Sequence, residues 1–321
     1  MRIPPFPARL SVPLAAVSLL SLLAATPPVA ATAAARPAAA DSTLKLEQYL
    51  EMEDVSDPRL SPDGDRVVYV RSWIDPMHDT RESALWIMGA DGSRDRHLVE
   101  GSSPRWSPSG DRLAFLACGT PGGDRSALQE CGEDAERQIW VRIMEGDGAG
   151  SVTQVTRMTE GASDIAWSPD GERIAFNRFV EDEDTYRVEL PERPEGAEWT
   201  EAPRVVDRLD YRQDGVGFTR EGHEHVFTVS AGGGTPRQVT HGPYDHGDPR
   251  WSPDGSTIYV DGLRTDDAAY EIRESEVYAV DVDTREITAL TDRNGPDGNP
   301  APGPDGEWIA YTGADSTGQT Y

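Results

Sequence analysis

The sequence predicts an all-β fold in which a unit of about four short strands is repeated along the chain. Two observations support this prediction. Short runs rich in β-branched and aromatic residues alternate with turn signals, which is the pattern of β-strands. A phrase of the type Trp-Ser-Pro-Asp-Gly also recurs, the fifth time in degenerate form, with its serine position at Ser61, Ser107, Ser168, Ser252 and Gly303. Five copies indicate an internal structural repeat.

Each copy of the phrase has the composition of a β-turn. Proline presets φ for the first corner, Asp or Ser suits the second, and glycine accepts the left-handed conformation from which the next strand leaves as a hairpin. Further strand-like segments follow each turn, so each unit holds about four strands. Four short antiparallel strands per repeat are typical of the blades of a β-propeller. We expect the tryptophan that precedes the turn, at Trp106, Trp167 and Trp251, to be a core packing residue.

Residues 1–33 have the three-part order of a secretory signal peptide. A basic start containing Arg2 and Arg9 precedes an apolar run over residues 10–25, and small residues around Ala31 and Ala33 favour cleavage there. The run is shorter than the roughly 20 residues that span a bilayer, although an uncleaved anchor is the alternative. We therefore expect an exported protein, periplasmic or secreted, with no membrane span after signal cleavage.

The rest of the chain divides into a leader segment, residues 34–56, and a propeller, residues 57–321. Within the leader, residues 44–52 fit a short amphipathic helix. The repeats are 46, 61, 84 and 51 residues apart, and the longest insertion lies between Phe179 and Val226. Four units are complete and a fifth starts at about Asn299. Because propellers close into a ring, we expect an incomplete ring in this chain, which would be a fragment of a longer one.

The charge balance argues against partners that are themselves anionic. The chain has 57 acidic and 30 basic residues, a formal net charge of -27. Such a chain is repelled by phosphate backbones and anionic lipid, so no nucleic-acid partner is expected. A solvated acidic face is the favoured interpretation of the excess, with adaptation to a salt-rich habitat as the alternative.

Cys118 and Cys131 are the two cysteines, 13 positions apart. In an oxidising compartment such a pair is expected to form a disulfide, with two buried free thiols as the alternative. A redox-active pair is not expected, because the spacing is not that of a C-x-x-C motif. His223 and His225 alternate on a predicted strand, yet neither they nor the histidines at 241 and 246 have a metal-binding spacing. The sequence therefore predicts no metal site and no cofactor.

The Trp-Ser-Pro-Asp-Gly repeats resemble those of TolB-like propellers. Three further stretches resemble a narrower family. Residues 55–70, 204–218 and 235–255 resemble the N-terminal propeller of prolyl-oligopeptidase-family serine peptidases, in the acylaminoacyl-peptidase and dipeptidyl-peptidase branch. The resemblance covers about residues 44–321. It implies that an α/β-hydrolase domain with a Ser-Asp-His triad follows the propeller, and that the propeller admits only short peptides. The implied partners are short peptide substrates and the protein's own C-terminal hydrolase domain.

No catalytic residue can be assigned within this chain, because it contains no G-x-S-x-G nucleophile motif. The acidic run that contains Glu181 and Glu183 lies in the longest insertion. Dipeptidyl-peptidase relatives hold the free amine of a peptide with propeller carboxylates, so the resemblance makes Glu181 and Glu183 candidates for substrate binding. A solvated loop is the alternative for the same run.

Two functions of different classes follow from these observations. The first is the substrate-gating propeller of an exported serine peptidase that hydrolyses short peptides, of the aminopeptidase, dipeptidyl-peptidase or acylaminoacyl-peptidase type. The alternative is a non-enzymatic periplasmic propeller that binds protein partners, as TolB does. The repeats alone do not separate the two, and the family-like stretch over residues 204–255 favours the peptidase.

Overall fold

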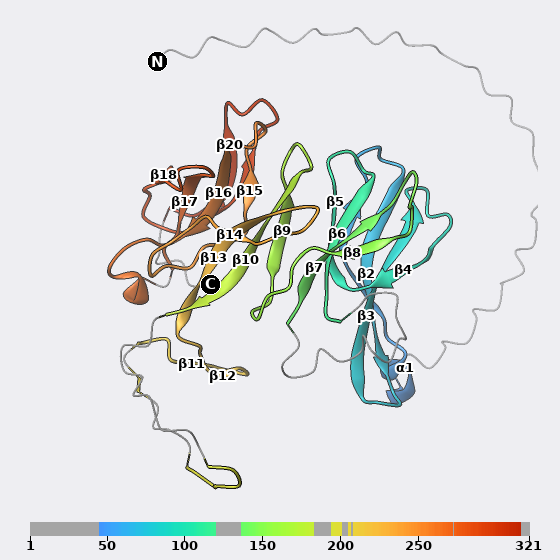
Figure 1. Cartoon of the computed structure of the whole chain (residues 1–321), viewed down its shortest axis with the longest axis horizontal. Helices are drawn as coiled ribbons and strands as arrows, with labels where there is room; N and C mark the ends of the chain where they lie inside the picture. The colour runs from blue at the N-terminus through green and yellow to red at the C-terminus, as the bar shows by residue number, and fades with distance from the viewer. Residues whose placement is uncertain are drawn as a thin grey trace, which may run out of the picture. The chain divides into compact units, whose positions relative to one another are not determined.

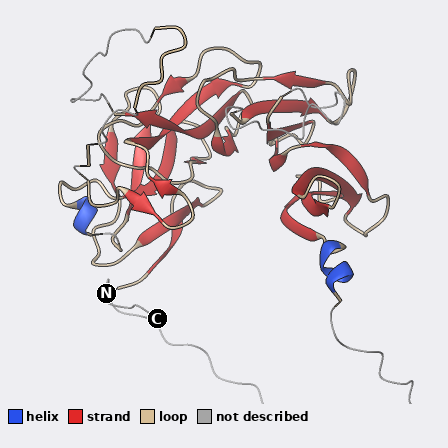
Figure 2. Cartoon of the chain, turned by 90° about the horizontal axis from the view of Figure 1, so that it is seen from below, coloured by secondary structure: helices blue, strands red, loops and turns tan. Residues whose placement is uncertain are grey.

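The computed structural model describes residues 45–119, 136–182, 194–200, 205–206, 208–271 and 273–315. Every helix and strand named below belongs to the unit Leu46–Tyr321. Strands provide nearly all of the regular structure, drawn in red in Figure 2. The prediction of an all-β fold is confirmed, while the predicted signal peptide lies outside the described residues.

Four sheets of four antiparallel strands follow one another along the chain (Figure 1). Within each sheet, strands that are consecutive in the chain, or consecutive apart from one insertion, are hydrogen-bonded neighbours, which is the strand order of a propeller blade. The sheets are β1 (Asp54–Leu60), β2 (Arg66–Asp75), β3 (Thr80–Gly89) and β4 (Arg96–Glu100); β5 (Ser102–Trp106), β6 (Arg112–Ala117), β7 (Gln138–Ile143) and β8 (Val152–Gln154); β9 (Ser163–Trp167), β10 (Arg173–Glu181), β13 (Gly222–Ser230) and β14 (Arg237–Gln238); and β15 (Arg250–Trp251), β16 (Thr257–Gly262), β17 (Glu276–Asp281) and β18 (Ile287–Ala289).

The remaining elements are short. A two-stranded sheet, β19 (Asp297–Pro302) and β20 (Ile309–Gly313), begins where the sequence predicts a fifth unit. Another pair, β11 (Arg212–Gln213) and β12 (Gly217–Phe218), lies beyond the ends of β10 and β13 (Figure 1). Helix α1 (Leu46–Leu50) falls within the predicted helical segment, and a 3-10 turn, η2 (Ala268–Tyr270), follows β16. Within the described ranges, no helix has the length and apolar character needed to cross a membrane.

The repeated phrase forms the turn that the sequence predicts. In the first copy, Gly64 N–H donates to Ser61 O at 2.9 Å, and Gly64 has φ +80. Arg66 N–H donates to the Ser61 hydroxyl at 2.9 Å, and that hydroxyl donates to the Asp63 carboxylate at 2.5 Å. The serine is buried in each of the first four copies, at Ser61, Ser107, Ser168 and Ser252. In each of these copies the serine hydroxyl accepts a hydrogen bond from the backbone N–H five residues later, so the buried hydroxyl satisfies a backbone donor.

The hydrophobic core lies between neighbouring sheets rather than inside any one of them. On β6, Leu113 and Phe115 pack against the first sheet, while Ala114 and Leu116 pack against the third. Successive side chains of a strand point to opposite faces, so a strand buried on both faces is apolar at every position. β6 shows this pattern, since its residues from Leu113 to Ala117 are all buried.

The tryptophans of the repeat also join neighbouring sheets. Trp251 is buried, and Trp106 and Trp167 are half-buried against the core. Each indole N–H donates to a backbone carbonyl of the preceding sheet: Trp106 to Arg59 at 3.0 Å, Trp167 to Arg105 at 2.9 Å and Trp251 to Ala166 at 3.1 Å. Core packing, which the sequence predicts for these residues, is therefore only one part of what they do.

Candidate functional site

A large cavity lies at the strand ends opposite the turns of the repeated phrase. It has a volume of about 1220 Å³ and is bordered by the ends of β10, β16 and β20, the start of β13, and residues 243–248. The volume exceeds the roughly 300–1,000 Å³ of typical small-ligand sites, so a short peptide segment would fit. We call it the acidic cavity because of the side chains that line it.

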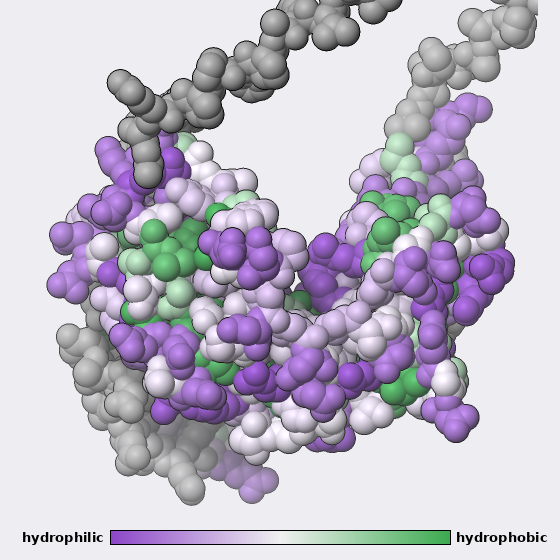
Figure 3. All heavy atoms as spheres, turned by 90° about the horizontal axis from the view of Figure 1, so that it is seen from above, coloured by the Kyte–Doolittle hydropathy of each residue, from purple (hydrophilic) through white to green (hydrophobic). Residues whose placement is uncertain are grey.

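Most of the charged groups that line the acidic cavity are carboxylates. Its basic lining residues are Arg208, His223 and His246. The carboxylates are those of Asp164, Asp182, Asp210, Glu224, Asp245, Asp248, Asp261, Asp266, Glu271 and Glu274. Figure 3 shows that hydrophilic residues also cover most of the visible face of the molecule. A concave surface of this composition attracts cations, because low-dielectric walls strengthen the field of the charges that line it.

Asp164 and Asp248 form a carboxyl pair from two neighbouring sheets. Asp164 lies on β9 in a left-handed conformation, φ +50, and Asp248 comes just before β15. Burial, together with the charge of Asp248, raises the pKa of Asp164. Close approach of the two carboxyl groups disfavours the charged form of Asp164, and a cation bound beside them would favour it.

Two buried oxygen atoms at the acidic cavity have no hydrogen-bond partner among the described residues. Glu224 on β13 leaves Oε2 unpaired, and its pKa is raised by burial and then by the charges of Asp245 and Asp164. Asn177 on β10 is 3% exposed, and its Nδ2 donates to His246 O at 2.8 Å while its Oδ1 is unpaired. Unpaired buried acceptors are uncommon in folded proteins, so these atoms mark a place where a donor would be bound favourably.

The histidines of this region are structural. His225 is buried, and its Nδ1 forms a hydrogen bond of 3.1 Å with Thr240 Oγ1. The centres of the His225 and His246 rings are 5.3 Å apart. Burial, with the charge of His223, lowers the pKa of His225 to about 4, and burial with Arg264 lowers that of His246 to about 3. Both rings are therefore neutral near pH 7. Across the described ranges, no cluster of His, Cys, Asp and Glu has the arrangement of a metal site.

The candidates named from the sequence lie outside the acidic cavity or outside the described residues. Glu181 ends β10, its side chain is 58% exposed, and it pairs with Arg220 at 3.4 Å. Glu183 lies outside the described residues. Between them, Asp182 lines the acidic cavity and lies 3.8 Å from Arg208 and from His223.

The two cysteines remain a predicted pair. Cys118, at the end of β6, is buried and disulfide-bonded. Cys131 lies outside the described residues, so its pairing with Cys118 stays a prediction. Tyr211 and Arg212, in the family-like stretch, are exposed near β11, and the ring of Tyr211 lies 6.3 Å from that of Phe218.

Sequence reasoning missed the main carboxylates of the acidic cavity, although one signal was available. Asp164 and Asp248 occupy equivalent positions, three residues before the tryptophan of the repeat. In the other units, the same position holds Asp57, Ser103 and Asn299, each with φ near +50. In the four units where this residue is left-handed, the strand register also shifts there, which is the mark of a β-bulge, and short polar side chains tolerate that conformation.

Comparison with known proteins finds peptidases among the relatives in sequence. The uncharacterized peptidase YuxL of Bacillus subtilis is 30% identical over 221 residues, which cover 67% of this chain and 31% of YuxL. A dipeptidyl-peptidase 5 of Porphyromonas endodontalis is 25% identical over 298 residues, 86% of this chain and 39% of that protein. The chain thus spans about a third of the length of these relatives. No protein-family model matches it.

Solved structures match the fold. An acylaminoacyl peptidase of Pyrococcus horikoshii superposes with a TM-score of 0.58 and 19% identity, over 84% of this chain and 36% of the peptidase. An acylaminoacyl peptidase in complex with Z-Gly-Gly-Phe-chloromethyl ketone superposes with a TM-score of 0.55 and 18% identity, over 84% of this chain and 39% of that chain. At these identities the structures show a shared fold alone. The all-β repeat architecture is that of the propeller portions of such enzymes.

Proposed function

Because this chain resembles the propeller portion of prolyl-oligopeptidase-family serine peptidases in sequence and in fold, we propose that it gates substrate entry in an exported peptidase that hydrolyses short peptides. The association with peptidases rests on the relatives in sequence. Gating, export and the preference for short peptides are the proposed part. The observation that carries the proposal is the match to a peptidase over 67% of the chain.

The acidic cavity gives this proposal a chemical basis. A short peptide with a free amino terminus brings an ammonium group, which a surface lined by ten carboxylates attracts. Glu224 Oε2 and Asn177 Oδ1 are unpaired acceptors for its N–H groups. Burial and neighbouring charge raise the pKa values of Glu224 and Asp164, and a bound ammonium group would oppose that shift by favouring the charged carboxylates.

The test uses an enzyme in which this propeller is joined to its own hydrolase domain. Peptide nitroanilides with a free amino terminus are compared with the same peptides after acetylation. We expect Glu224→Gln to raise KM about tenfold for the free-amine substrates, the effect of losing one charge-assisted contact, and to leave the acetylated substrates unchanged. Glu286→Gln, an exposed carboxylate outside the cavity, is the matched control. Equal effects of Glu224→Gln on both substrate series would contradict the amine-binding role.

A further inference from the structure

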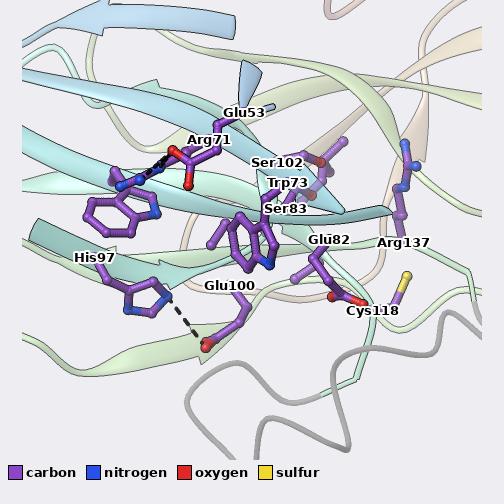
Figure 4. Close-up of a pocket in the computed structure, with 15 residues that line it drawn as sticks. Glu53, Arg71, Trp73, Glu82, Ser83, His97, Glu100, Ser102, Cys118 and Arg137 are labelled. Carbon is purple, nitrogen blue, oxygen red and sulfur yellow. Dashed lines mark hydrogen bonds and ion pairs between the residues drawn. The ribbon is translucent and has the colours of Figure 1, made fainter. Parts of the chain in front are cut away.

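A second cavity lies between the first and second sheets, well separated in sequence from the acidic cavity. It has a volume of about 550 Å³, within the roughly 300–1,000 Å³ of small-ligand sites. We call it the indole cavity because Trp73 on β2 and Trp86 on β3 line it. Figure 4 shows Trp73 between Arg71 and Arg137, which stand at opposite ends of the cavity.

Part of the lining of the indole cavity is apolar and buried. Ala84, Leu116, Ala117 and Cys118 form it, and each is less than 10% exposed. Trp73 and Trp86 are half-buried, and neither belongs to the three clusters that form the core. Two large aromatic side chains are thus placed on the wall of a hollow rather than in the packed interior. An apolar hollow with aromatic walls favours a flat or bulky apolar group as its occupant.

Most of the charged groups at the rim of the indole cavity already have partners. Arg71 pairs with Glu53 and also lies 4.3 Å over the ring of Trp86. His97 lies 3.5 Å from Glu100, and Glu82 accepts a hydrogen bond from Thr80 at 2.9 Å.

Two donors remain unpaired in this part of the structure. The Arg137 guanidinium forms no ion pair with another described residue, and the buried Trp86 Nε1–H has no hydrogen-bond acceptor among them. An arginine prefers a carboxylate, which it can bind through two parallel hydrogen bonds. The Trp86 Nε1–H is itself buried, so Arg137 is the donor of the two that a ligand in the cavity can reach. The free hydrogen-bonding capacity of the cavity is therefore that of a site for an anionic acceptor.

We propose that the indole cavity binds an aromatic group that carries a carboxylate, with the ring against Trp73 and the carboxylate at Arg137. The ligand is defined by this chemistry, which a small aromatic acid and the carboxyl-terminal residue of a peptide share. The site does not involve the acidic cavity, which is suited to cations, and it does not depend on the peptidase function.

The test is a calorimetric titration of the full chain with 3-phenylpropionate and with 3-phenylpropionamide, which has the same ring and no charge. We expect the carboxylate to bind about tenfold more tightly than the amide, the effect of one charge-assisted contact. Arg137→Gln should remove that difference, and Arg137→Lys should restore part of it. Trp73→Ala should weaken both compounds. Arg157→Gln, an exposed arginine outside the cavity, is the matched control and should change neither.

Three results would overturn the proposal: equal binding of acid and amide, acid binding that Arg137→Gln leaves unchanged, or no binding of the acid at millimolar concentration. Circular dichroism of each variant shows whether it is folded, and Arg137, being exposed, can be replaced without loss of core packing. The peptide Gly-Gly-Phe and its carboxyl-terminal amide form a second arm. Tighter binding of this peptide than of 3-phenylpropionate assigns the site to peptide termini, and the reverse assigns it to small aromatic acids.

Discussion

The arginine that follows the turn of the repeated phrase contacts the next sheet of the chain. Arg112 lies 5.0 Å over the ring of Trp167, and its Nη2 donates to Gly171 O at 2.8 Å. Arg173 repeats the arrangement on the following sheet, 4.8 Å over Trp251 and 3.0 Å from Gly255 O. One arginine side chain thus contacts both the tryptophan ring and the turn of the next sheet. Arg112 is visible in the sequence repeat. Its contact with Trp167, 55 residues further on, could not be predicted from the repeat.

We predict that Arg112→Ala lowers the free energy of unfolding by about 1–2 kcal/mol, because it removes a cation–π contact and a hydrogen bond to a backbone carbonyl. Urea denaturation followed by tryptophan fluorescence measures the change. Arg157→Ala, on an exposed arginine, should have an effect within about 0.5 kcal/mol. Equal losses in the two variants would show that the contact with Trp167 adds no stability.

The carboxyl pair of Asp164 and Asp248 predicts an unusual pH dependence of stability. Burial and the charge of Asp248 raise the pKa of Asp164, so the folded state holds this proton more tightly than the unfolded state does. The contribution to stability is full below the unfolded pKa of about 3.9 and is lost as the pH rises through the folded-state pKa. Asp164→Asn keeps a neutral side chain and tolerates φ +50.

The expected result is that Asp164→Asn becomes more stable relative to the unmodified chain as the pH is raised from about 4 to 7. Denaturation at a series of pH values measures this. Asp170→Asn is a control of opposite sign, since the hydrogen bond from Ser168 lowers the pKa of Asp170. Its deficit should shrink as the pH falls below about 4. A difference between Asp164→Asn and the unmodified chain that does not change with pH would refute the raised pKa of Asp164.

At the scale of elements, the predicted and observed strands differ most in the longest insertion. The sequence pattern over residues 204–218 is strand-like, yet the strands among the described residues of this stretch are the two-residue β11 and β12. Val205, Leu209, Val216 and Phe218 are all at least 48% exposed. These apolar side chains are not buried against a core. Strands without a buried face are only marginally stable in water. By contrast, β10 and β13 pair over nine positions, because both are buried between sheets.

The first pair of that ladder depends on a glycine. Gly222 has φ +150, and a Cβ built on it would lie 2.3 Å from Val180 O. We predict that Gly222→Ala lowers the free energy of unfolding by about 3 kcal/mol, through backbone displacement at the start of β13. Gly215→Ala is the matched control, since Gly215 has φ +80 with open space around it, and it should cost only about 1 kcal/mol. Equal costs would mean that the close approach at Gly222 relaxes freely.

For the whole molecule, the repeat predicts the number of sheets but not the cavities between them. The turns, the four-stranded units and the start of a fifth follow from one phrase and its spacing, because turn chemistry is local. The acidic cavity draws its carboxylates from residues 164–274, on several sheets. Which of the many acidic residues of a chain of net charge -27 meet in one hollow is decided by how sheets pack. That packing is not contained in any local pattern.

The last prediction concerns catalysis. Hydrolysis in the prolyl-oligopeptidase family requires a serine nucleophile, a histidine base, an aspartate that orients it and an oxyanion hole. The 321 residues contain no G-x-S-x-G motif that would present such a serine. We therefore expect this chain alone to hydrolyse no peptide nitroanilide. A longer product in which a hydrolase domain follows the propeller should hydrolyse short peptides and lose activity with a serine-directed phosphonylating reagent.

The measurement compares turnover by the two proteins, with and without the reagent, on short and long peptides of the same cleavable sequence. If the propeller gates entry, the longer product should discriminate against the long peptides, because a narrow entrance excludes them before any chemistry occurs. Activity in the 321-residue chain would reveal a catalytic site of another kind. A gene that encodes no G-x-S-x-G motif downstream would favour the non-enzymatic TolB-like alternative, in which the acidic cavity would bind a basic segment of a protein partner.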